Sequence, residues 1–220
     1  MVYRVTVVDT PIRATRWPVA PAWLVALVAG TAVGVATSFG QAVLDGAWAA
    51  LVNSASPWLV VAFAAGACAR RMPVAVPVGM LACLCEVAGY YVVTAARGYA
   101  VAESEIVFWS ACAIVGGPLF GAAGLAWWRR SPVGTAVPGA AFLAESLGLY
   151  ASVLHYWSTA ILYAAIAVPL TAVLAIRTVG SGGTVRIGRW WHVAGCLAVF
   201  TAVGVVGEYL LARVAGAVFS

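Results

Sequence analysis

The sequence contains no lysine and only two histidines, and charged residues make up 9% of its 220 residues. Soluble domains carry about 25% charged residues. Together with 64% hydrophobic residues and a mean hydropathy of +1.01, this scarcity excludes a soluble domain and indicates an integral membrane protein. The HExxH and GxSxG motifs are also absent, as is a pair of histidines at metal-ligand spacing. We therefore expect no enzyme, no metal site, no cofactor and no nucleic-acid partner.

Seven apolar stretches are long enough to cross a bilayer as helices, which need about 20 mostly apolar residues. The stretches are continuous and lack the alternating pattern of barrel strands. We therefore predict an all-α fold, a polytopic transmembrane helical bundle that forms a single domain over residues 1–220. The predicted helices cover residues 19–40, 50–69, 73–96, 106–128, 133–153, 157–176 and 191–213.

The twelve basic residues, all arginines, predict an orientation. Only Arg97 and Arg213 fall on one side of the predicted helices. The other side receives Arg4, Arg13, Arg16, Arg70, Arg71, Arg129, Arg130, Arg177, Arg186 and Arg189. Cytoplasmic loops carry the excess of basic residues, so we predict a multi-pass protein of the cell membrane with its N-terminus inside and its C-terminus outside. Alternatively, the first stretch is a cleaved signal peptide, because an arginine-bearing segment precedes it.

The segment "NSASPW", residues 53–58, separates two apolar stretches. Ser56 and Pro57 are predicted as the N-cap and the first residue of a helix. A helix from Pro57 to Ala69 has only 13 residues, about 20 Å of a core about 30 Å thick. Two interpretations remain open. Either the span is broken or re-entrant, with Asn53 at a cavity, or a continuous helix starts near Ala47 and is kinked at the proline.

The segment "VGGPLFGAAG" places Gly116, Gly117 and Pro118 near mid-membrane, where the proline predicts a kink. Gly121 and Gly124 continue a face of small residues that permits close helix approach. Helix packing explains this pattern. Discontinuous helices near the midplane, however, are also how transporters present backbone groups to a solute.

Three acids inside the apolar stretches are the strongest functional candidates, because buried ionisable groups in membranes are costly and face the bundle interior or a cavity. Each has a glycine three or four residues away on the same helical face. Aromatic residues near the predicted outer ends would add ring faces for a cation. The predicted ligand-binding residues are Glu86, Glu145, Glu208, Tyr90, Asn53 and His155.

A structural interpretation of the same residues stands beside the functional one. The acids would then be protonated and bonded across helices, the aromatic residues would form the interfacial belt, and His155 would be a surface or capping group.

Two functions follow from these observations. The first is a transporter, or its membrane-embedded binding subunit, for a small cationic solute or a proton, with an outward acidic and aromatic cavity. The second is a non-catalytic membrane partner or scaffold. Ala26, Gly30 and Gly34 form a small-residue face suited to contact with another protein or another copy of the chain.

Several motifs resemble an uncharacterised family of actinobacterial integral membrane proteins. They are "TSFGQ", "LVNSASPWLVVAFAAGA", "GYY" followed by "RG", and "FW" followed by "GGPLFGAAG", within residues 36–127. The resemblance implies residence in a membrane and contact with the lipid bilayer. It supplies no functional residue.

Overall fold

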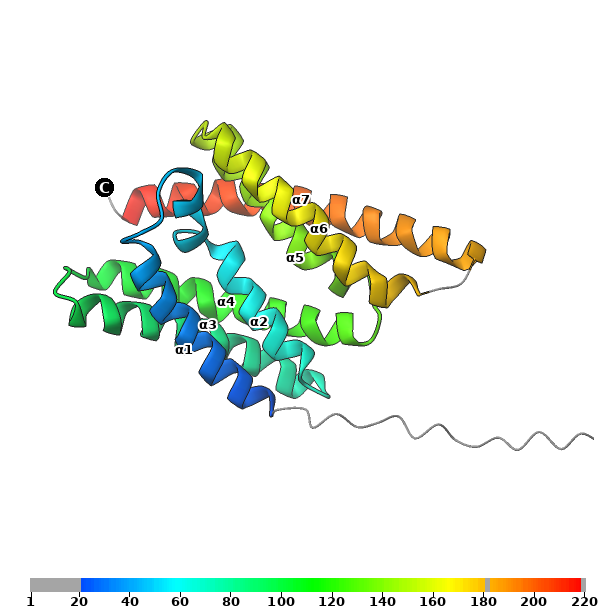
Figure 1. The fold of residues 1–220 in the computed structure, drawn as a ribbon, viewed down its shortest axis with the longest axis horizontal. Helices are drawn as coiled ribbons and strands as arrows, with labels where there is room; N and C mark the ends of the chain where they lie inside the picture. Colours follow the sequence, from blue (N-terminus) through cyan, green and yellow to red (C-terminus); the bar gives the residue numbers. More distant parts are fainter. Residues whose placement is uncertain (1–20, 181–182, 219–220) are drawn as a thin grey trace, which may run out of the picture.

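The computed structural model describes residues 21–180 and 183–218, and these residues form helices joined by short connections (Figure 1). The predicted all-α fold is confirmed, since no strand occurs in the described ranges. The helices are α1 (Ala22–Gly40), the 3₁₀ helix η1 (Gly46–Val52), α2 (Ala55–Ala67), α3 (Met72–Ala96), α4 (Glu103–Trp128), α5 (Pro132–Ala144), the π-helix η2 (Glu145–Val153), α6 (Trp157–Val179) and α7 (Gly183–Val218).

Six apolar helices are long enough to cross a membrane by themselves. They are α1, α3, α4, α5 continued by η2, α6, and the Gly188–Val214 part of α7. The pair η1 and α2 passes the same test together but is bent by 42°, which raises the number of possible spans to seven. The chain is therefore a multi-pass membrane protein, as the run of apolar stretches predicted.

The helices form two groups, which we call the first half-bundle (α1–α4) and the second half-bundle (α5, η2, α6 and α7). In the first, α3 packs on α1 and α4, and α2 lies against α3 and α4. In the second, α5 packs on both α6 and α7. Figure 1 shows α5, α6 and α7 on one side of α2 and the rest of the first half-bundle on the other. The groups meet mainly where α4 contacts α5.

Glycines set the close approach of helices in the first half-bundle. A Cβ atom on Gly121 would lie 2.2 Å from the carbonyl oxygen of Ala75, and one on Gly124 would lie 2.0 Å from that of Phe63. Helix α4 continues past Pro118 without a break in its helical structure. The small face of α4 therefore serves helix packing against α2 and α3, which is the simpler of the two interpretations of its sequence.

The Ala26, Gly30 and Gly34 face lies against α3 of the same chain. Ala26 is 0% exposed, and a Cβ atom on Gly30 or Gly34 would lie 2.5 Å or 2.2 Å from a carbonyl oxygen of α3. This face is occupied within the chain, so the prediction that it binds another protein or a second copy has no support from the structure. A small-residue face shows that a helix packs closely there, but it does not show which helix.

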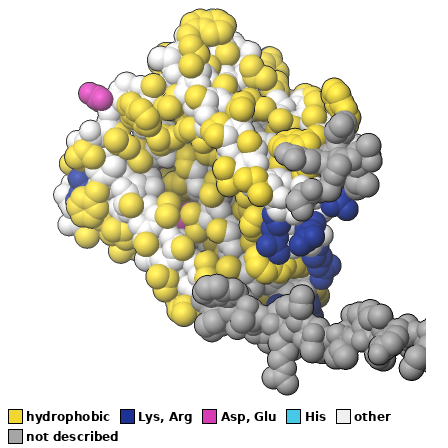
Figure 2. All heavy atoms as spheres, turned by 45° about the vertical axis from the view of Figure 1, so that its right-hand side comes forward, with side chains coloured by type: hydrophobic (Ala, Val, Ile, Leu, Met, Phe, Trp, Pro, Cys, Tyr) yellow, Lys and Arg dark blue, Asp and Glu magenta, His cyan; other side chains and the backbone are white. Residues whose placement is uncertain are grey.

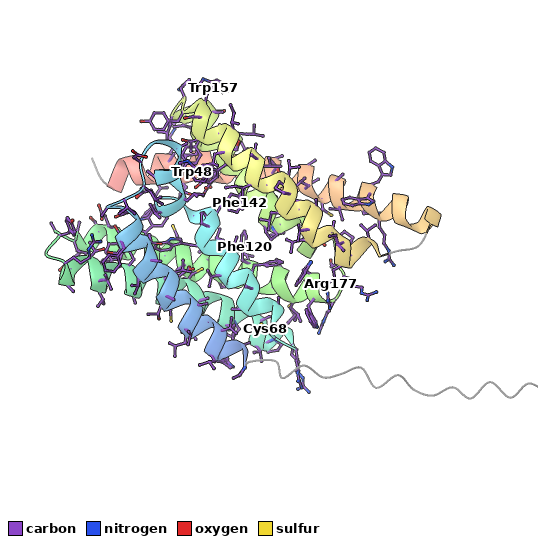
Figure 3. All side chains as sticks on the ribbon, viewed as in Figure 1. Trp48, Cys68, Phe120, Phe142, Trp157 and Arg177 are labelled. Carbon is purple, nitrogen blue, oxygen red and sulfur yellow. The ribbon has the colours of Figure 1, made fainter. Side chains whose placement is uncertain are left out.

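Most described arginines gather at one end of the bundle, which we call the arginine-rich end (Figure 2). This end carries the α2–α3, α4–α5 and α6–α7 connections, while Arg97 lies at the arginine-poor end, after α3. Trp157 and Arg177 mark opposite ends of α6 (Figure 3). The Arg177 guanidinium stacks 3.8 Å from the Trp128 ring centroid, as interfacial side chains do. Arg4, Arg13 and Arg16 lie outside the described residues.

The arginine distribution predicts that the arginine-rich end faces the cytoplasm. A reporter active only in the cytoplasm and fused after Ser220 should therefore give no signal, whereas the same reporter inserted after Arg130 should give a strong one. The reverse pattern would contradict the predicted orientation. Signal from both fusions would imply an even number of spans between Arg130 and the C-terminus.

Candidate functional site

The span formed by η1 and α2 is broken at Asn53 and Ser54. Helix α2 begins at Ala55 with extended backbone at Ser54, two residues before the predicted start at Pro57. The prediction of Ser56 as N-cap is therefore wrong, as is the alternative of one continuous, kinked helix. Because α2 has only 13 residues, about 20 Å in length, its first turn lies well inside the bundle and not at a membrane surface.

The carboxyl group of Glu145 caps the first turn of α2 from the second half-bundle. Its Oε1 accepts hydrogen bonds from the backbone N–H groups of Ala55 and Ser56, each at 3.0 Å, and its Oε2 lies 2.6 Å from the Ser54 hydroxyl. A helix N-terminus has unpaired N–H donors and a partial positive charge, so a carboxyl group is a favourable partner. Glu145 is 2% exposed. This contact therefore joins the half-bundles through a buried polar site.

Two arrangements of protons can be compared for the hydrogen bonds around Ser54. Tyr163 donates to the carbonyl oxygen of Ala50 at 2.8 Å, and its hydroxyl lies 2.5 Å from that of Ser54. With an ionised Glu145, Ser54 donates to Oε2, and the contact between the two hydroxyls has no proton. With a proton on Oε2, the carboxyl group donates to Ser54, Ser54 to Tyr163, and Tyr163 to Ala50. Only the second arrangement supplies a proton to all three contacts.

Glu145 is also the first residue of the π-helix η2. π-helical turns are rare, and many occur at functional sites. Tyr163 is fully buried between Tyr150 and Phe142, whose ring centroids lie 4.9 Å and 5.4 Å from its own. The hydrogen-bonded chain from Glu145 through Ser54 to Tyr163 is therefore held by aromatic packing on its second-half-bundle side.

A pocket of about 240 Å³ lies beside Ser54 at the arginine-poor end, and we call it the polar pocket. Hydrogen bonds join three of the elements around it. Tyr90 of α3 donates to Gln41 at 2.8 Å, Gln41 donates to Asn53 at 2.6 Å, and Asn53 donates to the carbonyl oxygen of Ala49 at 2.8 Å. The pocket is lined by Gln41, Val52, Asn53, Ser54, Trp58, Tyr90, Tyr91, Glu105 and Trp109.

Four aromatic rings and one carboxylate give the polar pocket its chemical character. The Trp58 ring centroid lies 6.1 Å from that of Tyr90 and 6.3 Å from that of Trp109, and Tyr91 packs edge-on against Tyr90. Glu105, in the first turn of α4, supplies the carboxylate. Ring faces attract organic cations, and a neighbouring carboxylate adds direct charge attraction. The pocket is therefore complementary to a small organic cation.

Asn53 and Tyr90 are the two predicted ligand-binding residues that line the polar pocket. Glu145 lies behind the pocket wall, in contact with Ser54. His155 is exposed in the connection between η2 and α6, with a positive φ of 59°. It does not line the polar pocket.

Glu86 and Glu208 also lie apart from the polar pocket. Glu86 is 0% exposed in α3 and has no hydrogen-bond partner for either carboxyl oxygen among the described residues beyond the weak thiol donor of Cys83 beside it. Glu208, on α7, lines apolar hollows between the half-bundles. Glu86 thus lies apart, whereas Glu208 packs beside Gly148 of η2, near enough to Glu145 for like charges on the two carboxyl groups to repel each other. Among the described residues, the three acids do not line one common pocket.

Glu105 and Gln41 are pocket residues that the sequence analysis missed. Glu105 lies at the start of α4 and not inside an apolar stretch, and an acid in the first turn of a helix is already explained by the helix dipole. The available signal was the spacing of Glu105 and Trp109, four residues apart and therefore on one face of a helix.

No protein of curated function and no solved structure matches this chain. The sequence profile of a family of unknown function, DUF6518, matches residues 13–214. This range contains both half-bundles from α1 to most of α7, the broken span and the polar pocket. The chain therefore belongs to the family of unknown function DUF6518.

Proposed function

We propose that this protein binds a small organic cation in the polar pocket and carries it across the membrane, either alone or as the membrane-embedded binding subunit of a transporter. The role is non-catalytic. The observation that carries the proposal is the polar pocket itself, in which four aromatic rings and Glu105 surround a hollow beside a broken span.

The size of the pocket limits the solute. Ligand pockets for drug-sized molecules measure about 300–1,000 Å³, whereas this one measures about 240 Å³. A compact amine or quaternary ammonium ion fits such a volume. A peptide or a lipid does not.

The broken span supports transport over simple binding. Transporters often use discontinuous helices to form a solute site inside the membrane, where non-helical backbone is tolerated only against protein or a cavity. Here Ser54 lines the cavity on one side and hydrogen-bonds to the titratable carboxyl group of Glu145 on the other. A proton is therefore the coupling ion that this geometry favours.

The alternative role as a scaffold loses its main support. It was based on the Ala26, Gly30 and Gly34 face, which α3 of the same chain occupies. We therefore take solute binding as the function to test.

Replacing Glu105 with glutamine should abolish stabilisation by a small cation. At about 100 times its dissociation constant, a ligand that binds only the folded state adds about 2.7 kcal/mol. We expect tetramethylammonium to raise the melting temperature of the purified protein by about 5 °C or more. The E105Q variant should lose most of this shift, because the amide carries no charge.

Glu103→Gln is the matched control, because Glu103 is exposed in the same turn of α4 and does not line the pocket. It should keep the full shift. Equal shifts in E105Q and E103Q, or no shift in the wild type, would contradict the proposed pocket. Uptake of radiolabelled tetramethylammonium into proteoliposomes under an imposed proton gradient then separates transport from binding alone.

A further inference from the structure

Two adjoining apolar hollows of about 450 and 680 Å³ lie between the half-bundles, and we call them together the lateral groove. Residues of α4 and α7 line both hollows together with Leu59 of α2, residues of α3 line each hollow, and alanine and valine residues of α5 line the larger one. Phe120 of α4, which lines the larger hollow, lies between the two half-bundles (Figure 3). Leu59, Gly116 and Glu208 line both hollows, so the groove is continuous.

The lateral groove lies beside a helix that is bounded mainly by lipid. Only 6% of the Gly188–Val214 window of α7 is buried inside the protein. Because α4 and α7 both span the membrane, a molecule dissolved in the hydrocarbon can reach the space between them without passing through water. The groove therefore differs from the polar pocket in its route of access.

Glu208 is the one carboxylate among the described residues that line the lateral groove. It makes no hydrogen bond or ion pair within the described part of the chain. The nearby Arg213 donates instead to the Tyr209 hydroxyl, and Glu145 is engaged with α2. An acid at membrane depth is costly unless a proton, water or a cation accompanies it. The groove thus combines apolar walls with an unpaired acid.

Together, the apolar walls and the acid determine which class of ligand the lateral groove favours. Apolar walls favour a molecule that partitions into the bilayer, and the unpaired carboxylate favours a positive charge on it. Trp58 and Trp109 line the same end of the groove as Glu208 and offer ring faces to that charge. An anionic phospholipid headgroup would instead be repelled by Glu208.

We propose that the lateral groove is a second binding site, which takes a lipophilic organic cation from the bilayer and holds its charged centre at Glu208. This site goes beyond the polar pocket, because its ligand class and route of entry are different. Trp58 and Trp109 line both sites, and their ring centroids are 6.3 Å apart. The two indoles therefore form the partition between the membrane-facing site and the polar pocket.

The test is binding of radiolabelled tetraphenylphosphonium to the purified protein in lipid nanodiscs, with empty nanodiscs subtracted. The wild type should bind it saturably, and uncharged triphenylphosphine oxide should not displace it. Glu208→Gln should weaken binding about tenfold or more, because the amide keeps the shape but not the charge. Glu103→Gln, which removes a carboxylate that lines neither hollow, should bind like the wild type.

A second variant keeps the carboxylate and fills the groove. A Cβ atom on Gly116 would meet only the end of the flexible Leu59 side chain, at 3.0 Å, so Gly116→Leu should fold and yet block tetraphenylphosphonium. Gly195→Leu on α7, where a Cβ atom meets nothing within 4 Å, is its control.

Three results would overturn the proposal. They are wild-type affinity in Glu208→Gln, wild-type affinity in Gly116→Leu, and displacement of the cation by the neutral phosphine oxide. The last would identify a groove for lipid chains without selectivity for charge. Tetramethylammonium binding to the polar pocket is measured separately, so the results can contradict one proposed site and still support the other.

Discussion

Replacing Glu145 with alanine is expected to lower the free energy of unfolding by about 3 kcal/mol or more. The change leaves the N–H groups of Ala55 and Ser56 and the hydroxyl of Ser54 without their buried partner. Each unsatisfied buried donor costs about 1–3 kcal/mol. Water entering the space offsets part of this loss, so the low end of the sum is the expected value. The melting temperature in detergent should fall by about 10 °C.

Glu145→Gln separates the loss of hydrogen bonds from the loss of charge. The glutamine amide can accept from both backbone N–H groups through its oxygen and donate to Ser54 through its nitrogen, which is the pattern of a protonated carboxyl group. If Glu145 carries a proton, as the three contacts around Ser54 indicate, this variant should unfold within about 1 kcal/mol of the wild type.

A large loss of stability in Glu145→Gln would contradict the idea that Glu145 carries a proton. A glutamine variant as unstable as the alanine variant would mean that the folded protein needs a negative charge at the start of α2. A Ser54→Ala and Glu145→Ala double-mutant cycle measures the direct coupling, and we expect about 1–3 kcal/mol. Independent effects would contradict the hydrogen bond between them.

Replacing Gly34 with leucine is expected to prevent the first half-bundle from packing. A Cβ atom at this position would lie 2.2 Å from the carbonyl oxygen of Glu86 and 2.9 Å from the backbone nitrogen of Tyr90. Neither atom can move without displacing α3. Ordinary overpacking costs about 1–3 kcal/mol because side chains can adjust. A clash with backbone should exceed this range and leave little folded protein after extraction.

The measurement for Gly34→Leu is the yield of monodisperse protein and its melting temperature, with Gly195→Leu as the matched control. A Cβ atom on Gly195 meets nothing within 4 Å, so that variant should behave like the wild type. A Gly34→Leu protein that stays folded but changes its oligomeric state would place this face between copies of the chain. That result would contradict its packing on α3.

The sequence predicts most of the architecture because membrane physics acts locally. Each span must satisfy its own backbone and remain apolar over its length, so its presence can be read from about 20 consecutive residues. The predicted 73–96 and 157–176 helices correspond closely to α3 (Met72–Ala96) and α6 (Trp157–Val179). The small residues of α4 were likewise correctly read as packing residues, since glycine at helical spacing has a direct steric effect.

The candidate site was harder to predict because its contacts join distant parts of the chain. Glu145 stands 90 residues from Ala55, so no local pattern around "NSASPW" shows what caps α2. The three acids look alike in sequence but have different surroundings. Glu86 is buried in a helix contact, Glu145 caps a helix, and Glu208 lines the lateral groove. Only the arrangement of the half-bundles assigns these separate environments.

During synthesis, the first turn of α2 is made well before the residue that caps it. Ser54 and its partner Glu145 are 91 residues apart, and ribosomes add about 5–20 residues per second. For about 5–20 s, therefore, the first turn of α2 has been made while the carboxyl group that completes it has not. Throughout this interval the insertion machinery, or water held within it, must satisfy the exposed N–H groups. The slowest step in placing this short helix is then the synthesis of Glu145, the first residue of η2.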